Sequence, residues 1–121
     1  MATSGAWETF AVVVVGADDA DMASAANRIY ELGGGVTLCA QGSVHAELPL
    51  PIGGLLSDLK LEDIARRLNT IQGKAEELGF RHPDAALTLA TLTTAAIPFL
   101  RLSEDGLVDV RTGRAVEMIL S

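Results

Sequence analysis

The run from Glu47 to Asp58, with the sequence ELPLPIGGLLSD, restricts the possible folds more than any other part of the chain. Pro49 and Pro51 have no backbone N–H and fix φ at about −65°, so the run cannot lie in the interior of a β-sheet. The run is also nearly all apolar, so we do not expect a solvated loop. It therefore predicts a rigid, irregular connection between a strand and a helix that covers a core, a partner domain or a ligand pocket.

The composition indicates one globular domain that binds neither nucleic acid nor membranes. The chain has 121 residues, of which 49% are hydrophobic and 21% are charged, and these values suit a single core. The formal net charge is −7 and the basic residues are scattered, whereas nucleic acid and anionic membranes require a concentrated basic patch. No apolar stretch approaches the roughly 20 residues of a membrane span, and no secretory signal is recognisable. The cytoplasm is the predicted location, and the single cysteine, Cys39, is expected to be a buried thiol.

The expected fold class is α+β, with a single domain in which two main helices pack on a mixed β-sheet. Residues 1–9 are expected to be a frayed N-terminus and residues 10–121 to form the domain. The continuous β-branched run 10–15 predicts a strand buried on both faces. Residues 85–97 fit either a buried helix or an irregular strand. The other expected elements are a helix from the aspartates at 18–21 to Gly33, a hairpin of strands 36–40 and 43–48, a helix over 61–78 with Ser57 or Asp58 near its cap, and strands at 100–102, 107–110 and 115–120.

Three side chains near the proline-containing run are the only plausible acid–base groups, namely His45, Glu47 and Asp58. A carboxylate pair can perform acid–base chemistry when burial separates the two pKa values. Each carboxylate also has a structural interpretation, since Glu47 fits the solvent side of a strand and Asp58 fits a helix cap. His45 and His82 are the only histidines, and neither has a second histidine or cysteine at ligand spacing, so the residues predict no metal site.

The apolar run itself is the candidate interface or ligand segment. An exposed apolar patch commonly marks an interaction site, so we expect the chain not to be a monomer. The residues of this segment are Pro49, Leu50, Pro51, Ile52, Gly53, Gly54, Leu55, Leu56 and Ser57.

Three blocks carry a resemblance to a known family. The chain reads VVVVGADDADMASAANRIYELGGGV over Val12–Val36, GSVHAELPLPIGGLLSDL over Gly42–Leu59 and IPFLRLSEDGLVDV over Ile97–Val110. Together these blocks resemble the C-terminal domain of the bacterial and archaeal adenine deaminases, members of the amidohydrolase superfamily. The middle block is the most specific of the three, and the resemblance covers almost the entire chain.

The resemblance implies a role in purine metabolism. Family members hydrolyse adenine to hypoxanthine and ammonia in a metal-dependent barrel, where His and carboxylate ligands hold iron or manganese that activates a water. The C-terminal domain follows that barrel and packs against it. We expect no barrel in this chain, so manganese or iron is implied only for a full-length family member, and no cofactor is expected in this chain.

Three functions remain open at this point. The one we favour is a domain that is non-catalytic alone and that packs on an amidohydrolase barrel or self-associates as a homo-oligomer. A second is a small enzyme that uses His45, Glu47 and Asp58. A third is a purine-binding or regulatory module of the segment 47–58, with the backbone of residues 49–57 recognising the ring.

Overall fold

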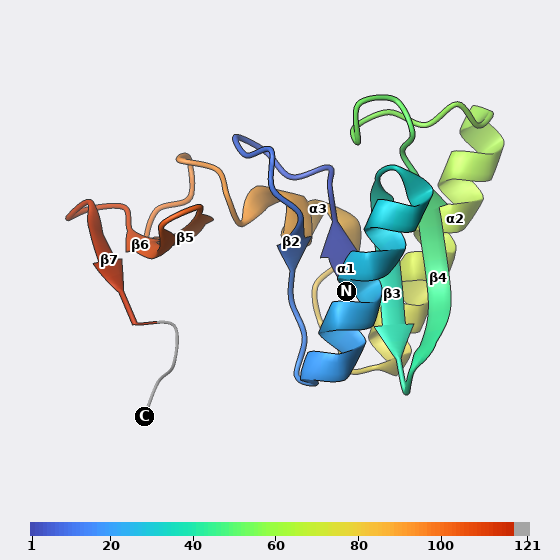
Figure 1. Ribbon diagram of the computed structural model, residues 1–121, viewed down its shortest axis with the longest axis horizontal. Helices are drawn as coiled ribbons and strands as arrows, with labels where there is room; N and C mark the ends of the chain where they lie inside the picture. The colour runs from blue at the N-terminus through green and yellow to red at the C-terminus, as the bar shows by residue number, and fades with distance from the viewer. Residues whose placement is uncertain (118–121) are drawn as a thin grey trace.

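The computed structural model describes residues 1–117 (Figure 1). Its elements form a body of helices around one antiparallel sheet, with a second, smaller sheet at one side, so the α+β prediction is confirmed. In chain order they are β1 (Ala2–Thr3), β2 (Val13–Val14), α1 (Asp19–Leu32), β3 (Gly35–Ala40), β4 (Ser43–Pro49), α2 (Leu61–Glu77), α3 (Ala85–Thr91), β5 (Leu100–Ser103), β6 (Gly106–Asp109) and β7 (Arg114–Val116).

The sheet of the body has the strand order β2-β1-β3-β4, and its two faces pack against different helices. Side chains alternate across a strand, so neighbouring residues of β3 point to opposite faces. Leu38 lies in the core cluster that contains Ile71 of α2. Cys39 lies in the cluster that contains Ala25 and Ile29 of α1. The two long helices therefore cover opposite faces of the sheet (Figure 1).

Local chemistry explains where α1 and the β3–β4 hairpin form. The side chain of Asp18 caps α1 by accepting a hydrogen bond from Asp21 N–H, and Gly33 ends the helix in the left-handed conformation at φ 71°. The carboxylate of Asp21 accepts hydrogen bonds from the N–H groups of Gln41 (2.9 Å) and Gly42 (2.8 Å). Those two residues have positive φ, as in the two-residue hairpin turns that match the twist of the strands. Asp21 thus holds the start of α1 to the hairpin turn.

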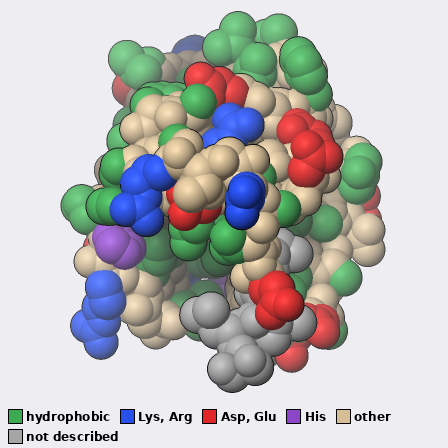
Figure 2. All heavy atoms as spheres, turned by 90° about the vertical axis from the view of Figure 1, so that its left-hand side faces the viewer, with side chains coloured by type: hydrophobic (Ala, Val, Ile, Leu, Met, Phe, Trp, Pro, Cys, Tyr) green, Lys and Arg blue, Asp and Glu red, His purple; other side chains and the backbone are tan. Residues whose placement is uncertain are grey.

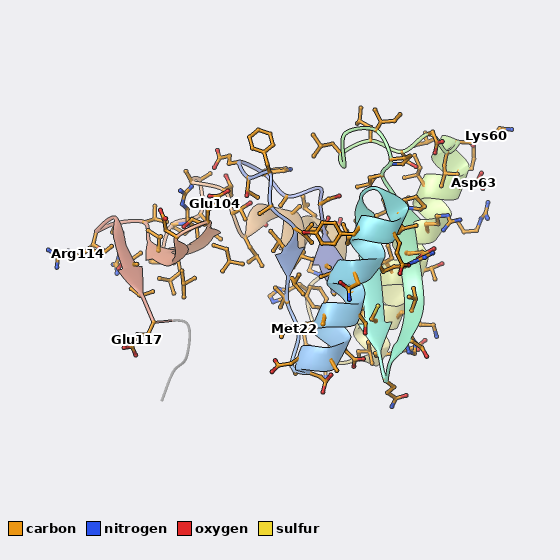
Figure 3. The ribbon with its side chains drawn as sticks, viewed as in Figure 1. Met22, Lys60, Asp63, Glu104, Arg114 and Glu117 are labelled. Carbon is orange, nitrogen blue, oxygen red and sulfur yellow. The ribbon has the colours of Figure 1, made fainter. Side chains whose placement is uncertain are left out.

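The β5-β6-β7 sheet extends from the side of the body (Figure 1). In Figure 3, Arg114 in β7 and Glu117, directly after that strand, lie on the side of the small sheet that is remote from the body. Leu102 is the main apolar link, because it packs against the buried cluster of Ala6, Val13 and Leu89. Its N–H also donates to Leu92 O at 2.8 Å. Within residues 1–117, no helix has the length and apolar character that crossing a membrane requires.

The N-terminal part differs most from the prediction. A frayed segment at residues 1–9 is wrong, because Ala2 and Thr3 are 0% and 1% exposed in β1, between β2 and β3. A fully buried strand over 10–15 is also wrong, because only Val13 and Val14 form a strand and it lies at the sheet edge. The cause is that β1 offers just two residues for pairing, so β2 is equally short.

The unrecognised strand β1 also explains why the sheet is not mixed. It lies between β2 and β3 and runs antiparallel to both. A direct β2–β3 pairing across the α1 crossover, which would be parallel, is therefore replaced by two antiparallel pairings. All strand pairs among the described residues are antiparallel.

Two further predictions concern element ends. The helix cap at Ser57 or Asp58 is wrong, because α2 begins at Leu61 and its N-cap, Lys60, makes no side-chain capping bond. The ambiguous segment 85–97 contains the helix α3 and then turns. The strand predicted over 115–120 is β7 up to Val116, and positions 118–120 lie outside the described residues.

Candidate functional site

Residues 50–56, called the 50–56 loop below, form a tight turn directly after β4. Ile52 N–H donates to Leu56 O, and Leu56 N–H donates to Ile52 O, both at 3.1 Å. Between them, Gly53 and Gly54 have φ values of 62° and 74°, a conformation that glycine adopts without strain. The Gly-Gly pair of the sequence is thus the tip of a closed loop.

The loop is anchored to the body by its first residue and by a serine from the N-terminal strand region. Leu50 is 8% exposed in the main core cluster, and its N–H donates to Gly34 O at 2.9 Å. Ser4 Oγ donates to Gly54 O at 2.7 Å and accepts from Gly35 N–H at 2.8 Å. At Gly34 there is no room for a side chain, because a Cβ would lie 2.6 Å from both Gly54 Cα and Leu50 O. The fold therefore fixes where the loop sits.

The loop presents apolar side chains to solvent. Ile52, Leu55 and Leu56 are 52%, 59% and 62% exposed. Figure 2 shows hydrophobic side chains gathered along the upper edge of the molecule, the end at which Figure 1 places the β4–α2 connection. Leu50 corrects the predicted segment, because its side chain belongs to the core and is not part of this surface.

A groove of about 700 Å³ runs beside the 50–56 loop. The loop lines it with Gly53, Gly54 and Leu55, the N-terminal segment 4–12 lines it from the other direction, and the end of α1 supplies Tyr30. Phe10 and Tyr30 are both largely exposed. Glu8 is the only charged residue in the lining. The volume lies within the range of ligand and side-chain binding sites.

The predicted acid–base residues do not assemble into a catalytic site. Arg28 donates to both carboxylate oxygens of Glu47, from Nε to Oε2 at 2.8 Å and from Nη2 to Oε1 at 3.0 Å. This pairing lowers the pKa of Glu47, so the carboxylate stays ionised and ties α1 to β4. Exposed His45 has Nε2 at 3.0 Å from Ala40 O. His45 and Glu47 share a shallow hollow, but Asp58 is exposed and does not line it.

The donor set for a metal is also lacking among residues 1–117. No group of three or more His, Cys, Asp or Glu side chains in this range is placed to hold a metal ion. The manganese or iron that the resemblance implies for a full-length member therefore does not fit these residues, and we assign no chemical step to it. Burial raises the pKa of the Cys39 thiol, which keeps that group protonated and unreactive.

Sequence reasoning missed the part of the groove formed by residues 4–12. The prediction of a frayed N-terminus over residues 1–9 removed Glu8 from consideration as a site residue, and Phe10 was assigned to a buried strand over residues 10–15. A usable signal was present, since aromatic residues make up only 4% of the chain and Phe10 and Tyr30 are nevertheless on the surface. The role of Ser4 left no sequence signal, because it depends on a contact with Gly54, fifty residues away.

Comparison with known proteins identifies the family. A family model described as the adenine deaminase C-terminal domain matches residues 1–114. The adenine deaminase of Kosmotoga olearia is 41% identical over 120 residues, which are 99% of this chain and 21% of the relative. The adenine deaminase of Archaeoglobus fulgidus is 40% identical over 118 residues, 98% of this chain and 21% of the relative. That of Methylobacterium nodulans is 44% identical over 110 residues, 91% of this chain and 20% of the relative. The chain spans about a fifth of the length of these curated relatives, and it belongs to the adenine deaminase C-terminal domain family.

Proposed function

We propose that this chain is a non-catalytic docking domain that contacts a catalytic domain of the adenine deaminase type through the 50–56 loop. The observation that carries the proposal is the exposure of Ile52, Leu55 and Leu56 on a backbone that the fold holds in place. Exposed apolar patches mark interaction sites. A loop that is ordered before binding also loses little conformational entropy when a partner covers it.

Two further observations support this proposal. The curated relatives named adenine deaminase are about five times as long as the matched region, so each carries a large part to which such a domain can attach. In this chain, Glu47 is engaged with Arg28 and Asp58 lies apart from it, which argues for binding over acid–base chemistry. We therefore expect the chain alone to release no more ammonia from adenine than a blank.

The test is a binding measurement with a matched pair of surface variants. The partner is the Kosmotoga olearia adenine deaminase without the 120 residues that align with this chain. Leu55→Ser should weaken the complex by about tenfold, since a well-placed apolar contact is worth about 1–2 kcal/mol. Leu78→Ser is the control, because Leu78 is equally exposed (55% against 59%) but lies at the other end of α2.

Size-exclusion chromatography with light scattering provides the readout and also tests self-association. A complex with the partner that Leu55→Ser weakens and Leu78→Ser does not is the expected result. A homo-oligomer of the chain alone, lost in Leu55→Ser, would assign the same loop to a second copy. A monomer that forms no complex with the partner would refute the docking proposal.

A second candidate function is purine binding in the groove beside the loop. It is favoured by one observation: the Gly53 and Gly54 N–H groups donate to no acceptor within residues 1–117, and they lie in a groove that Phe10 and Tyr30 also line. Free N–H groups and aromatic rings are suited to a planar heterocycle. A rise in melting temperature with adenine or hypoxanthine would support this candidate, and no rise across a purine panel would remove it.

A further inference from the structure

We propose that the groove beside the 50–56 loop receives an arginine side chain of the docked catalytic domain, an inference that rests on the proposed function. The groove is lined by two exposed aromatic residues, Phe10 and Tyr30, and by one acidic residue, Glu8. A guanidinium group is planar, stacks on aromatic rings and pairs with carboxylates. These three side chains therefore offer what a guanidinium needs and what a purely apolar side chain does not.

Charge in and around the groove favours a cation. No basic residue lines it, and the chain as a whole carries a formal net charge of −7. Arg101 is the nearest cation to Glu8, but it lies outside the lining and its Nη1 is 4.0 Å from Glu8 Oε2. Glu8 Oε1 accepts no hydrogen bond from residues 1–117. One carboxylate oxygen is thus available to a positively charged group from a partner.

The backbone around Glu8 is held in an unfavourable conformation by its neighbours. Glu8 has φ 60°, a region that is unfavourable for a residue other than glycine. Trp7 N–H donates to Ala90 O at 2.9 Å, the Thr93 hydroxyl donates to Trp7 O, and Ala95 N–H donates to Glu8 Oε2. These contacts with the end of α3 and the segment after it hold Glu8 in the lining of the groove before any partner arrives, which is the arrangement expected of a preformed site.

Arginine fits this groove better than lysine does. An ammonium group is compact and strongly hydrated, whereas the guanidinium group is weakly hydrated and can stack on one ring while it donates to Glu8. The volume of about 700 Å³ leaves space for the side chain together with part of the segment that carries it. The exposed leucines of the 50–56 loop then cover the flanking apolar surface of the partner.

The test uses two charge-removing variants that keep the fold. Glu8→Gln removes the charge of the lining (side chain 52% exposed), and Glu31→Gln removes a charge (side chain 64% exposed) from the last turn of α1 outside the lining. Glu8→Gln should weaken binding of the truncated Kosmotoga olearia partner by about tenfold, and the weakening should shrink at high salt. Tyr30→Leu should weaken binding too, whereas Glu31→Gln should leave the affinity unchanged.

A second measurement does not depend on the partner. N-acetyl-arginine amide is titrated into the full chain at millimolar concentrations, and the amide signals of Gly53, Gly54 and Tyr30 are followed by NMR. We expect these signals to shift in the wild type and not in Glu8→Gln, and N-acetyl-leucine amide to cause no such shifts. Adenine is titrated in parallel to test the purine candidate.

The outcomes separate this inference from the proposed function. A complex that tolerates both Glu8→Gln and Tyr30→Leu would keep the docking proposal and overturn the arginine inference. If the wild-type chain does not bind the partner, the docking proposal is refuted. The titration with the arginine amide then decides whether the groove accepts a guanidinium group. Shifts with adenine but none with the arginine amide would overturn the inference in favour of the purine candidate.

Discussion

The 50–56 loop and the β5-β6-β7 sheet both expose apolar side chains, yet the body supports them to different degrees. The loop is hydrogen-bonded to Ser4 and packed against Gly34. Phe99, directly before β5, and Leu100 within β5 are 62% and 45% exposed, and the hydrogen bonds of the sheet are mostly within itself. Exposure alone therefore does not separate the loop, for which we propose docking, from the small sheet. What separates them is that contacts with the core set the shape of the loop.

The strand register explains why the small sheet is less well supported. Leu102, Leu107 and Val116 are cross-strand neighbours, so they share one face of the sheet. Of these three, only Leu102 packs against a buried cluster of the body. A small sheet gains independent stability only when such a face is covered. We therefore expect residues 100–116 to open more readily than the strands of the body.

The largest expected effect is that of Gly34→Ala, which tests whether the loop is fixed by the core. A Cβ at Gly34 would clash with Gly54 Cα and Leu50 O at 2.6 Å, and φ is 123°, so strain and overpacking add to about 4 kcal/mol of lost unfolding free energy. Gly33→Ala is the control, because its φ is 71° and nothing lies within 4 Å, which leaves about 1 kcal/mol of backbone strain. Urea denaturation measures both. Equal losses in the two variants would mean that the loop moves aside and is not fixed.

Features set by local residue chemistry could be predicted from the sequence, whereas features set by contacts between distant residues could not. The start of α1 at the aspartates of 18–21, its end at Gly33 and the hairpin turn at 41–42 are local, so residue chemistry within a few positions predicted them correctly. The position of β1 depends on contacts with residues ten or more positions away, and two residues are too few to show a periodic pattern. The proline-containing run correctly indicated an irregular connection. The segment 4–12 lines the groove opposite the loop. It lies there because β1, the strand that the sequence did not reveal, directly precedes it.

An intermediate effect is expected for Leu102→Ala, which tests whether the small sheet depends on one apolar link. Loss of this half-buried side chain should cost about 2 kcal/mol, felt mainly by residues 100–116. Hydrogen exchange of those amides should accelerate more than that of β3 and α2. Val108→Ala is the control, because Val108 lies on the opposite face from Leu102. Uniform acceleration across the whole chain would show that the small sheet and the body unfold as one unit. It would contradict the claim that residues 100–116 open more readily than the body.

The smallest effects are expected when the pH is lowered. The body and the small sheet each contain one carboxyl group whose pKa is lowered. Hydrogen bonds from Arg28 lower the pKa of Glu47, and the Thr9 hydroxyl lowers that of Glu104, which Figure 3 places where the small sheet meets the body. A carboxyl group whose pKa is lowered by folding stabilises the protein at pH values above the pKa that the group has in the unfolded chain. That stabilisation is lost as the pH falls through the lower pKa that the group has in the folded protein.

Both contributions are therefore complete at neutral pH and decline below the ordinary pKa of 4.5. Glu47→Gln should flatten the acid dependence of the urea midpoint of the body, because it removes the group that ties α1 to β4. Glu104→Gln should leave that midpoint unchanged and flatten the acid dependence of hydrogen exchange in residues 100–116. Water screens both groups, so the changes should be smaller than those of the glycine and leucine variants. If the two variants changed the same observable by the same amount, the two regions would share one acid-sensitive unfolding step, and their different support would not extend to their stability.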